Sequence, residues 1–227
     1  MARRDLSRTV VVLDLDDTLY AEADYRASGL RAVCAMVNLL LNPATPLDSV
    51  SLKLVDEGDP LAQICKRVGL PPSLKETLLW VYRLHIPDIH LSPEVGRVVA
   101  TLESHCQAVA VLTDGRSISQ RLKLKALGLA HLPAYISEDY DSGKPAPLRY
   151  QKVMGDFPAQ AYVYLGDNPL KDFAAPNALQ WQTVGLRGVG VPGGTRNIHS
   201  QDCEGLPAAN LPQQWVSSMD EFLESLC

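Results

Sequence analysis

Four short polar motifs contain the residues of this chain that could do chemistry: DLDDTLY at 14–20, LTDG at 112–115, GKP at 143–145 and GDNPLKD at 166–172. They supply carboxylates, the hydroxyl of Thr113 and the amine of Lys144, and each motif follows an apolar run or lies in the crossover behind one. The candidate catalytic residues are Asp14, Asp16, Thr113 and Lys144. The candidate metal-binding residues are Asp14, Asp16, Asp167 and Asp172. Such a set can hold a divalent cation, anchor a phosphoryl group and attack it with a carboxylate.

Three of these side chains come directly after a predicted strand. Asp14, Thr113 and Asp167 each stand where an apolar run ends. Because α/β sheets bind ligands outside the carboxyl ends of their strands, we expect the three residues to line one edge of a sheet. Carboxylates brought this close repel one another unless a cation lies between them. Magnesium suits an oxygen-only site of this kind, so the sequence predicts bound Mg²⁺.

Each motif taken alone has an ordinary structural interpretation. Asp and Thr after a strand also serve as turn and helix-capping residues. A calcium-binding EF-hand loop starting at Asp14 is excluded, because it needs Gly where Leu19 stands and Glu where Tyr25 stands. The four motifs occur together, in order and each at a strand end or crossover, and this combination favours a functional site.

The elements that must position these motifs alternate between strands and helices. Buried strands are predicted at 9–13, 108–112, 134–136, 161–165 and 183–186. Helices are predicted to begin at Ser92-Pro93, at a Ser117/Gln120 capping box and at a Ser218/Glu221 capping box. The alternation predicts an α/β protein with a doubly wound, mostly parallel, Rossmann-like sheet.

A long insertion separates the first two motifs. The stretch between Asp16 and Thr113 is far longer than one strand-to-strand crossover needs. Three helices are predicted inside it, at 26–41, 60–68 and 73–85, the third opened by a Ser73/Glu76 capping box. We therefore expect a catalytic core formed by 1–19 and 91–227, with an α-helical cap inserted at 20–90. The Gly-, Pro- and Asn-rich tail at 188–214 is expected to be a surface loop.

Composition excludes several classes of protein. With 46% hydrophobic residues and a net charge of −5, the 227-residue chain lacks the basic stripe typical of nucleic-acid-binding proteins. No apolar run is long enough for a membrane span or a signal peptide. The five cysteines form no CxxC pair, and the five histidines have no metal-ligand spacing. We therefore expect free thiols, structural histidines and a cytoplasmic protein without a nucleic acid polymer or a membrane as partner.

With these four motifs in this order, the chain resembles the haloacid dehalogenase-like (HAD) hydrolase superfamily over essentially all of its length. The resemblance is to the branch with a small helical cap between the first and second motifs. It implies that Asp14 is the nucleophile that forms an aspartyl-phosphate, and that Asp16 is the general acid and base. It also implies that Thr113 and Lys144 anchor the phosphoryl oxygens.

The same resemblance implies a magnesium site. Asp167 would be a direct ligand, together with the carboxylate of Asp14 and the backbone carbonyl of Asp16. Asp172 resembles the second acid of the family's last motif, which holds metal-bound waters or orients Lys144. One departure is Pro176, which stands where related chains have a small residue and should shorten or kink the helix after this motif.

The resemblance further implies a reaction. Family members that act as dehalogenases lack an acid two residues after the nucleophile, and Asp16 is present here. The expected enzyme is a Mg²⁺-dependent phosphatase that acts on a small phosphate monoester such as a sugar phosphate or nucleoside monophosphate. A phosphomutase stays open as an alternative, as does a phospho-aspartate signalling protein or a non-catalytic binding protein. The expected substrate-binding residues are Thr113, Asp114, Lys144, Arg116, Glu22, Tyr25 and Arg26.

Overall fold

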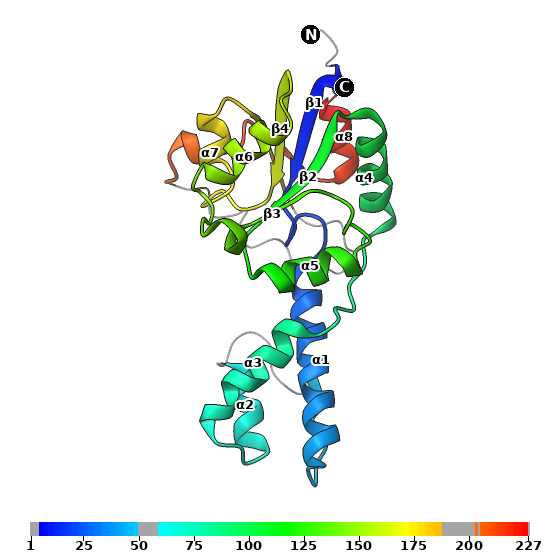
Figure 1. The fold of residues 1–227 in the computed structure, drawn as a ribbon, viewed down its shortest axis with the longest axis vertical. Helices are drawn as coiled ribbons and strands as arrows, with labels where there is room; N and C mark the ends of the chain where they lie inside the picture. The colour runs from blue at the N-terminus through cyan, green and yellow to red at the C-terminus, as the bar shows by residue number, and fades with distance from the viewer. Residues whose placement is uncertain (1–4, 50–58, 188–202, 204, 227) are drawn as a thin grey trace.

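The chain folds around a parallel β-sheet. The structure is a computed structural model that describes residues 5–49, 59–187, 203 and 205–226. In these residues six strands pair in the order β3-β2-β1-β4-β5-β6, and every pair is parallel (Figure 1). The strands are β1 (Thr9–Leu13), β2 (Ala108–Thr113), β3 (Ala134–Ile136), β4 (Ala161–Gly166), β5 (Gln182–Leu186) and β6 (Gln214–Val216). The predicted doubly wound, Rossmann-like α/β fold is therefore confirmed.

Helices cover both faces of the sheet. Within β1, Val11 and Leu13 pack on one face, whereas Val10 and Val12 pack on the other. The first face is covered by α4 (Pro93–His105), α5 (Ser117–Ala126) and α8 (Met219–Leu226), and the second by α6 (Leu148–Asp156) and α7 (Ala174–Ala178). Because both faces are buried, β1 needs an unbroken apolar run, which is what the sequence has there.

The three predicted helix starts in the core are confirmed, but one of the predicted caps is wrong. Ser92 accepts from the Val95 amide at 3.2 Å and caps α4. Ser218 accepts from the Glu221 amide at 3.0 Å and caps α8. The predicted Ser117/Gln120 capping box does not form, because Ser117 is already the first residue of α5 and its amide donates to Glu138 at 2.7 Å. The side chain of Gln120, the second member of the predicted box, instead donates to Thr113 and Asp16 in the pocket described below.

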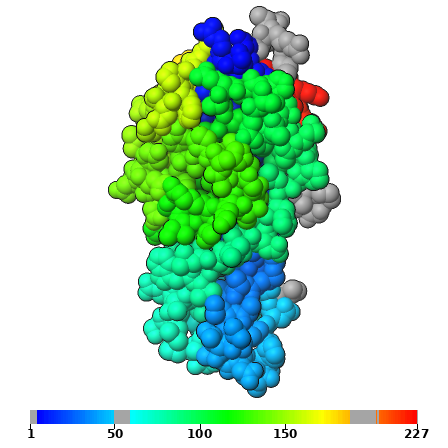
Figure 2. All heavy atoms as spheres, turned by 45° about the vertical axis from the view of Figure 1, so that its right-hand side comes forward, coloured from blue at the N-terminus to red at the C-terminus, as the bar shows by residue number. Residues whose placement is uncertain are grey.

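Three helices between β1 and α4 extend away from the carboxyl end of the sheet (Figure 1). They are α1 (Glu22–Leu41), α2 (Pro60–Arg67) and α3 (Lys75–Leu84). They pack on one another through an apolar cluster of their own, which includes Leu30, Val33, Ile64 and Leu78. Their side chains abut those of the core in the space-filling view (Figure 2), and Ser119 of α5 donates to the Arg83 carbonyl at the end of α3 at 3.0 Å.

The predicted starts of two of these helices need correction. α1 begins at Glu22, four residues before the predicted start. The Ser73/Glu76 capping box is absent, because a 3-10 turn over Pro72–Leu74 leads directly into α3. Asp59, which was not singled out, caps α2 by accepting from the Leu61 amide at 3.0 Å.

The C-terminal part of the chain adds a strand that the sequence did not predict. Most of the expected loop at 188–214 lies outside the described residues, but β6 extends the sheet beyond β5. Trp215 of β6 lies so close to Gly185 that a Cβ there would come within 2.4 Å of its ring. Pro176 stands inside the short helix α7, in agreement with the expected early end. None of the described helices is long and apolar enough to cross a membrane.

Candidate active site

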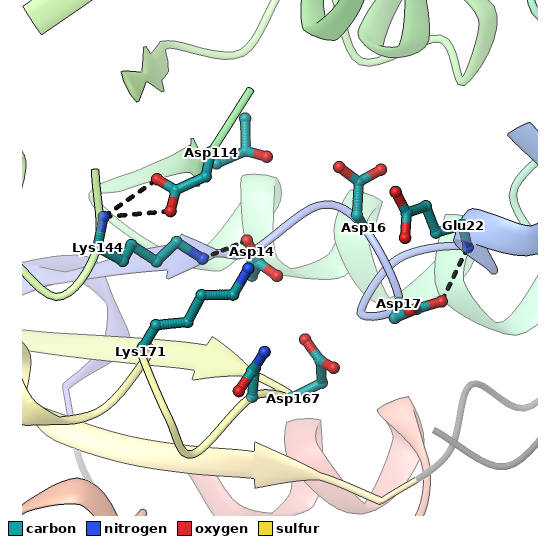
Figure 3. A pocket seen from close by; sticks show the side chains of 10 residues that line it. Asp14, Asp16, Asp17, Glu22, Asp114, Lys144, Asp167 and Lys171 are labelled. Carbon is teal, nitrogen blue, oxygen red and sulfur yellow. Dashed lines mark hydrogen bonds and ion pairs between the residues drawn. The ribbon is translucent and has the colours of Figure 1, made fainter. Parts of the chain in front are cut away.

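A polar pocket opens at the carboxyl edge of the sheet, where β1, β2 and β4 end beside the start of α1. It is open to solvent, and Figure 3 shows its side chains from close by. Its lining residues are Asp14, Asp16, Asp17, Glu22, Thr113, Asp114, Lys144, Asp167, Asn168 and Lys171. All four sequence motifs contribute to it. The six carboxylates outnumber the two ammonium groups, and this excess of negative charge favours a bound cation.

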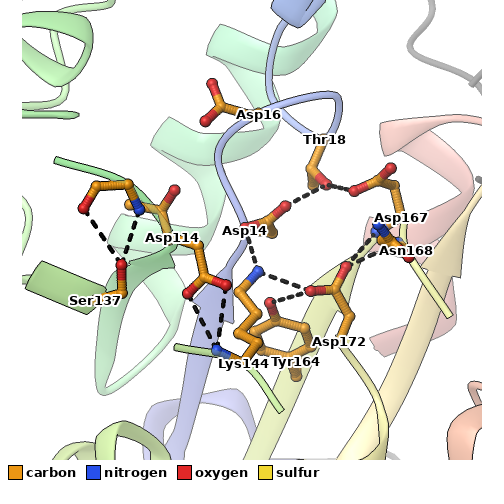
Figure 4. A network of polar contacts seen from close by, with 12 residues as sticks. Asp14, Asp16, Thr18, Asp114, Ser137, Lys144, Tyr164, Asp167, Asn168 and Asp172 are labelled. Carbon is orange, nitrogen blue, oxygen red and sulfur yellow. Dashed lines mark hydrogen bonds and ion pairs between the residues drawn. The ribbon is translucent and has the colours of Figure 1, made fainter. Parts of the chain in front are cut away.

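Asp14 lies at the centre of the pocket, at the end of β1. Its amide donates to the Leu165 carbonyl of β4 at 2.9 Å, which fixes the backbone. Its Oδ1 lies 2.5 Å from Nζ of Lys144 (Figure 4). Burial, with a smaller contribution from the neighbouring Asp172 carboxylate, raises the pKa of Asp14 to about 7, although the Lys144 ammonium opposes the shift. A cation against this carboxylate would favour its charged form.

Lys144 is held between two carboxylates. Its side chain is 1% exposed, and Nζ lies 2.7 Å from Oδ1 of Asp172 in addition to its contact with Asp14. Burial alone would lower the pKa of Lys144, but the two carboxylates raise it well above its ordinary value. The ammonium is therefore charged at neutral pH and points at the carboxylate of Asp14.

Asp172 is an orienting residue, because both of its oxygens are occupied. Oδ1 faces Lys144, and Oδ2 accepts from the amides of Asp167 and Asn168 at 3.1 and 2.8 Å (Figure 4). The carboxylate is fully buried and does not line the pocket. Only glycine fits at position 166, since a Cβ there would lie 2.7 Å from Oδ2 of Asp172. Of the two roles expected for Asp172, this geometry favours the orientation of Lys144.

Asp14 and Asp167 have the geometry of a cation site. The hydroxyl of Thr18 lies 3.4 Å from Oδ2 of Asp14 and 3.4 Å from Oδ1 of Asp167, so the two carboxylates face a common point (Figure 4). Oxygens of Asp14, Asp167 and Asp172 lie within 4.8 Å of one another. Carboxylate oxygens in a partly hydrated pocket are the donor set that Mg²⁺ prefers. With Asp172 bound to Lys144, Asp14 and Asp167 are the residues that fit a metal.

Asp16 lies across the pocket from this pair and is held by three donors. Lys123 Nζ lies 2.8 and 2.9 Å from its two oxygens, Gln120 Nε2 donates to Oδ2 at 3.0 Å, and the hydroxyl of Tyr20 donates to Oδ1. Burial raises the pKa of Asp16, but the Lys123 ammonium and these hydrogen bonds outweigh burial and lower it overall. Sequence reasoning missed Lys123 and Gln120 as site residues, because a lysine and a glutamine on a helix usually face solvent.

Thr113 and Asp114, at the end of β2, are both engaged by neighbouring side chains. Gln120 Nε2 donates to Oγ1 of Thr113 at 2.6 Å, so one amide joins Thr113 to Asp16. The carboxylate of Asp114 accepts from the Lys144 amide at 3.2 Å and from the buried guanidinium of Arg149. Arg149 also donates to the Thr113 carbonyl at 2.7 Å. Asp114 therefore joins the second motif to the third, and nothing in the sequence singled out Arg149.

Four further residues were expected to bind substrate, three in the helical segment and Arg116 in the core, and they do not all reach the pocket. Glu22, at the start of α1, lines it, and the Glu22 amide donates to Asp17 at 2.8 Å. Tyr25 is buried, 5% exposed, with its ring over the Lys123 ammonium. Arg26 lies 3.8 Å from Glu22 and lines a separate apolar pocket, whereas Arg116 pairs with Glu138 in a neighbouring groove. Of the four, only Glu22 lies where it could contact a ligand in the main pocket.

Two residues of the last motif line the pocket although they were not singled out. Asn168 accepts from the Leu170 amide at 3.0 Å and shapes the turn after β4. Lys171 reaches into the pocket toward Asp14 (Figure 3). Lys171 is the one cation of the GDNPLKD motif and, with Lys144, the second lysine of the four motifs, which was a visible signal that this part of the site could bind an anion.

The site thus combines a parallel sheet with a carboxylate at the end of its central strand, a buried lysine beside that carboxylate and a second aspartate facing it. A model of the haloacid dehalogenase-like hydrolase family matches residues 11–186. The chain therefore belongs to this family. No curated protein is similar enough to this chain to match it.

Solved structures of HAD-like hydrolases share the whole fold. One is the HAD-hydrolase YfnB from Bacillus subtilis, bound to magnesium. It is 16% identical to this chain, with a TM-score of 0.66, and the match covers 97% of this chain and 99% of that chain. A 2-haloacid dehalogenase from Pseudomonas syringae is 20% identical, with a TM-score of 0.62 and coverage of 96% and 97%. A predicted phosphoglycolate phosphatase from Haemophilus somnus is 16% identical, with a TM-score of 0.58 and coverage of 96% and 97%. At these identities the likeness shows the fold, and the reaction must be argued from the site.

Proposed function

We propose that this chain is a Mg²⁺-dependent phosphatase that hydrolyses a small phosphate monoester through a phosphoryl intermediate on Asp14. The observation that carries the proposal is the carboxylate of Asp16, which shares the pocket with the Asp14–Lys144 pair. A leaving alkoxide needs a proton, and a departing halide does not. An acid at this position is therefore useful to a phosphatase and has no evident use in a dehalogenase.

In the first half of the reaction, Asp14 attacks phosphorus and the bond to the leaving oxygen breaks. In its ionised form a carboxylate is already a nucleophile, so Asp14 needs no neighbouring base to activate it. Lys144 lies 2.5 Å from Asp14, where its ammonium would also face the oxygens of a phosphoryl group. Thr113 offers its hydroxyl from the end of β2, and Lys171 adds a second positive charge at the pocket wall. These groups offset the repulsion between a phosphate dianion and the carboxylates.

Asp16 would transfer the proton needed in each half of the reaction. As an acid it would protonate the leaving oxygen. As a base it would take a proton from the water that attacks the phosphoryl group on Asp14. Groups positioned for such transfers typically contribute about 10² to 10⁴-fold to the rate.

The metal would be held by Asp14 and Asp167, with the backbone carbonyl of Asp16 as a further ligand. When bound, Mg²⁺ supplies positive charge that stabilises the phosphoryl oxygens and keeps Asp14 ionised. The excess of carboxylates in the pocket and the shared position of Asp14 and Asp167 support this assignment.

The helical segment, residues 20–90, would act as a cap over a core formed by 1–19 and 91–227. Its side chains would determine which leaving groups fit the site. Glu22 lines the same pocket as the catalytic residues, so a bound ester would meet α1. The pocket is lined by charged and polar groups that would face a phosphoryl group and a metal, and we expect the ester to be a small metabolite such as a sugar phosphate or a nucleoside monophosphate.

The test is phosphate release from a panel of these esters with Mg²⁺ and with excess EDTA. We expect turnover that EDTA abolishes. Asp167→Ala should raise the Mg²⁺ concentration needed for half-maximal activity about tenfold or more. Asp24→Ala removes an exposed acid at the start of α1 and should leave the metal dependence unchanged. Full activity in EDTA, or equal metal dependence of both variants, would contradict the metal assignment.

A further inference from the structure

A buried lysine of the core holds Asp16, and a tyrosine of the helical segment covers that lysine. Lys123 of α5 has a side chain that is 6% exposed, and its ammonium lies 2.8 and 2.9 Å from the two oxygens of Asp16. The same ammonium lies 4.2 Å from the ring centroid of Tyr25 in α1. We propose that Lys123, kept in place by Tyr25, is the positioning residue that orients Asp16 as the base of the hydrolytic step. The proposal rests on the phosphatase function above.

The contacts of Lys123 are specific in geometry. A lysine on a helix normally extends its ammonium into water, and removing it from water is costly unless it is well paired. Here the Lys123 ammonium reaches both oxygens of one carboxylate, and an aromatic face covers it on another side. Buried ion pairs contribute little net stability compared with apolar residues of the same volume. The fixed orientation of Asp16 is therefore the more evident benefit of this arrangement.

The orientation matters because Asp16 has acidic neighbours. Asp14, Asp17 and Glu22 line the same pocket. Without a positive charge beside it, the carboxylate of Asp16 would be repelled by these groups and could rotate away from the water it must activate. Gln120 and Tyr20 also donate to Asp16, but both are neutral, so Lys123 alone among these three donors balances its charge.

The step that depends on this orientation is the release of phosphate. Water forms a bond to phosphorus, one of its protons passes to the Asp16 carboxylate, and the bond between phosphorus and the Asp14 oxygen breaks. Its electron pair returns to Asp14 as a carboxylate, and phosphate leaves. The form of Asp16 needed here is the ionised one, which is the form that an ammonium ion stabilises.

Tyr25 connects this device to the helical segment. It lies one turn after Glu22 on α1, so the helix that contributes to the pocket also packs on Lys123. A movement of α1 away from the core would uncover Lys123 to water. The position of the helical segment would then influence the orientation of the base.

The test measures the pre-steady-state release of p-nitrophenol from p-nitrophenyl phosphate. Its leaving group needs almost no protonation, so formation of the phosphoryl enzyme should survive in Lys123→Met while breakdown slows. We expect kcat to fall about tenfold or more and KM to fall in proportion, so that kcat/KM stays within about threefold of the wild-type value. A burst approaching one equivalent of p-nitrophenol per enzyme should appear. Lys123→Arg keeps the charge and should recover part of kcat. Tyr25→Leu should lower kcat more than Tyr25→Phe does, because phenylalanine keeps the aromatic ring over the Lys123 ammonium.

The matched control is Lys125→Met, which removes an exposed lysine two positions along the same helix and should behave as the wild type. Folded Lys123→Met with unchanged kcat, or with reduced kcat and no burst, would overturn the proposal. If Lys123→Met does not fold, the two Tyr25 variants decide. Equal kcat values for Tyr25→Leu and Tyr25→Phe, with no burst of p-nitrophenol in either, would overturn the proposal. A wild type that releases no p-nitrophenol would contradict the phosphatase function itself.

Discussion

At the scale of the residue, the site consists of carboxylates at strand ends and of cationic side chains from neighbouring helices that hold two of them, Asp16 and Asp114. Asp14, Thr113 and Asp167 follow buried strands, and strand ends are where α/β sheets place their ligands. Lys123 and Arg149 lie on helices, and only the folded chain shows that they turn inward to Asp16 and Asp114. Local sequence patterns do not report which face of a helix meets a pocket.

Removing the acid function of Asp16 should affect substrates according to their leaving groups. Asp16→Asn keeps the shape of the side chain and loses its proton. We expect kcat/KM for an alkyl phosphate to fall about 10² to 10⁴-fold. The loss for p-nitrophenyl phosphate should be much smaller, because its leaving oxygen is already a weak base. The comparison of the two kcat/KM values checks the role, and equal losses for both esters would argue against proton donation.

At the scale of the element, five of the six described strands were predicted, because a strand buried on both faces is an apolar run with few alternatives. β6 was missed, since only Val216 of its three residues is buried and the strand begins inside the Gly-, Pro- and Asn-rich stretch that indicated a loop. The capping boxes at Ser117 and Ser73 were wrong for a different reason. A local pattern can be outweighed by a tertiary contact: the Ser117 amide donates to Glu138 and the side chain of Gln120 serves the pocket.

The junction between α1 and α3 should be sensitive to acid. His85, 8% exposed, lies with Nδ1 2.5 Å from the Tyr82 carbonyl and Nε2 3.0 Å from the Ser28 hydroxyl. Burial lowers its pKa below the usual 6.5, with a smaller contribution from nearby Arg31 and Lys123. The unfolded chain therefore binds a proton at higher pH than the folded chain does. Stability that His85 contributes is complete above pH 6.5 and is lost as the pH falls toward the folded pKa.

The measurement is the free energy of unfolding in urea for wild type and His85→Gln. We expect the wild type to be the more stable at about pH 7.5, and its advantage to shrink at about pH 5.5. The comparison cancels the other titrating groups, since both proteins share them. An advantage that grows on acidification would show that the folded state favours the charged imidazole.

At the scale of the whole molecule, the fold brings four distant segments to one point. The strand order places β1 between β2 and β4, so the loops after these three strands meet. The third motif arrives from the crossover between β3 and α6, where Asp114 accepts from the Lys144 amide. The helical segment enters directly after the first motif, and its first residue, Glu22, reaches the pocket. The first motif and the start of the helical segment are thus adjacent in the chain.

The central claim is that Asp14 becomes covalently phosphorylated during turnover. The direct measurement is to quench the enzyme during steady-state hydrolysis with Mg²⁺, reduce the acyl phosphate with borohydride and locate the modified residue by peptide mass spectrometry. We predict modification of the peptide that contains Asp14, at position 14, and its absence in Asp14→Asn, which should fold but release no phosphate. Turnover without modification at Asp14, or wild-type phosphate release by Asp14→Asn, would contradict the account.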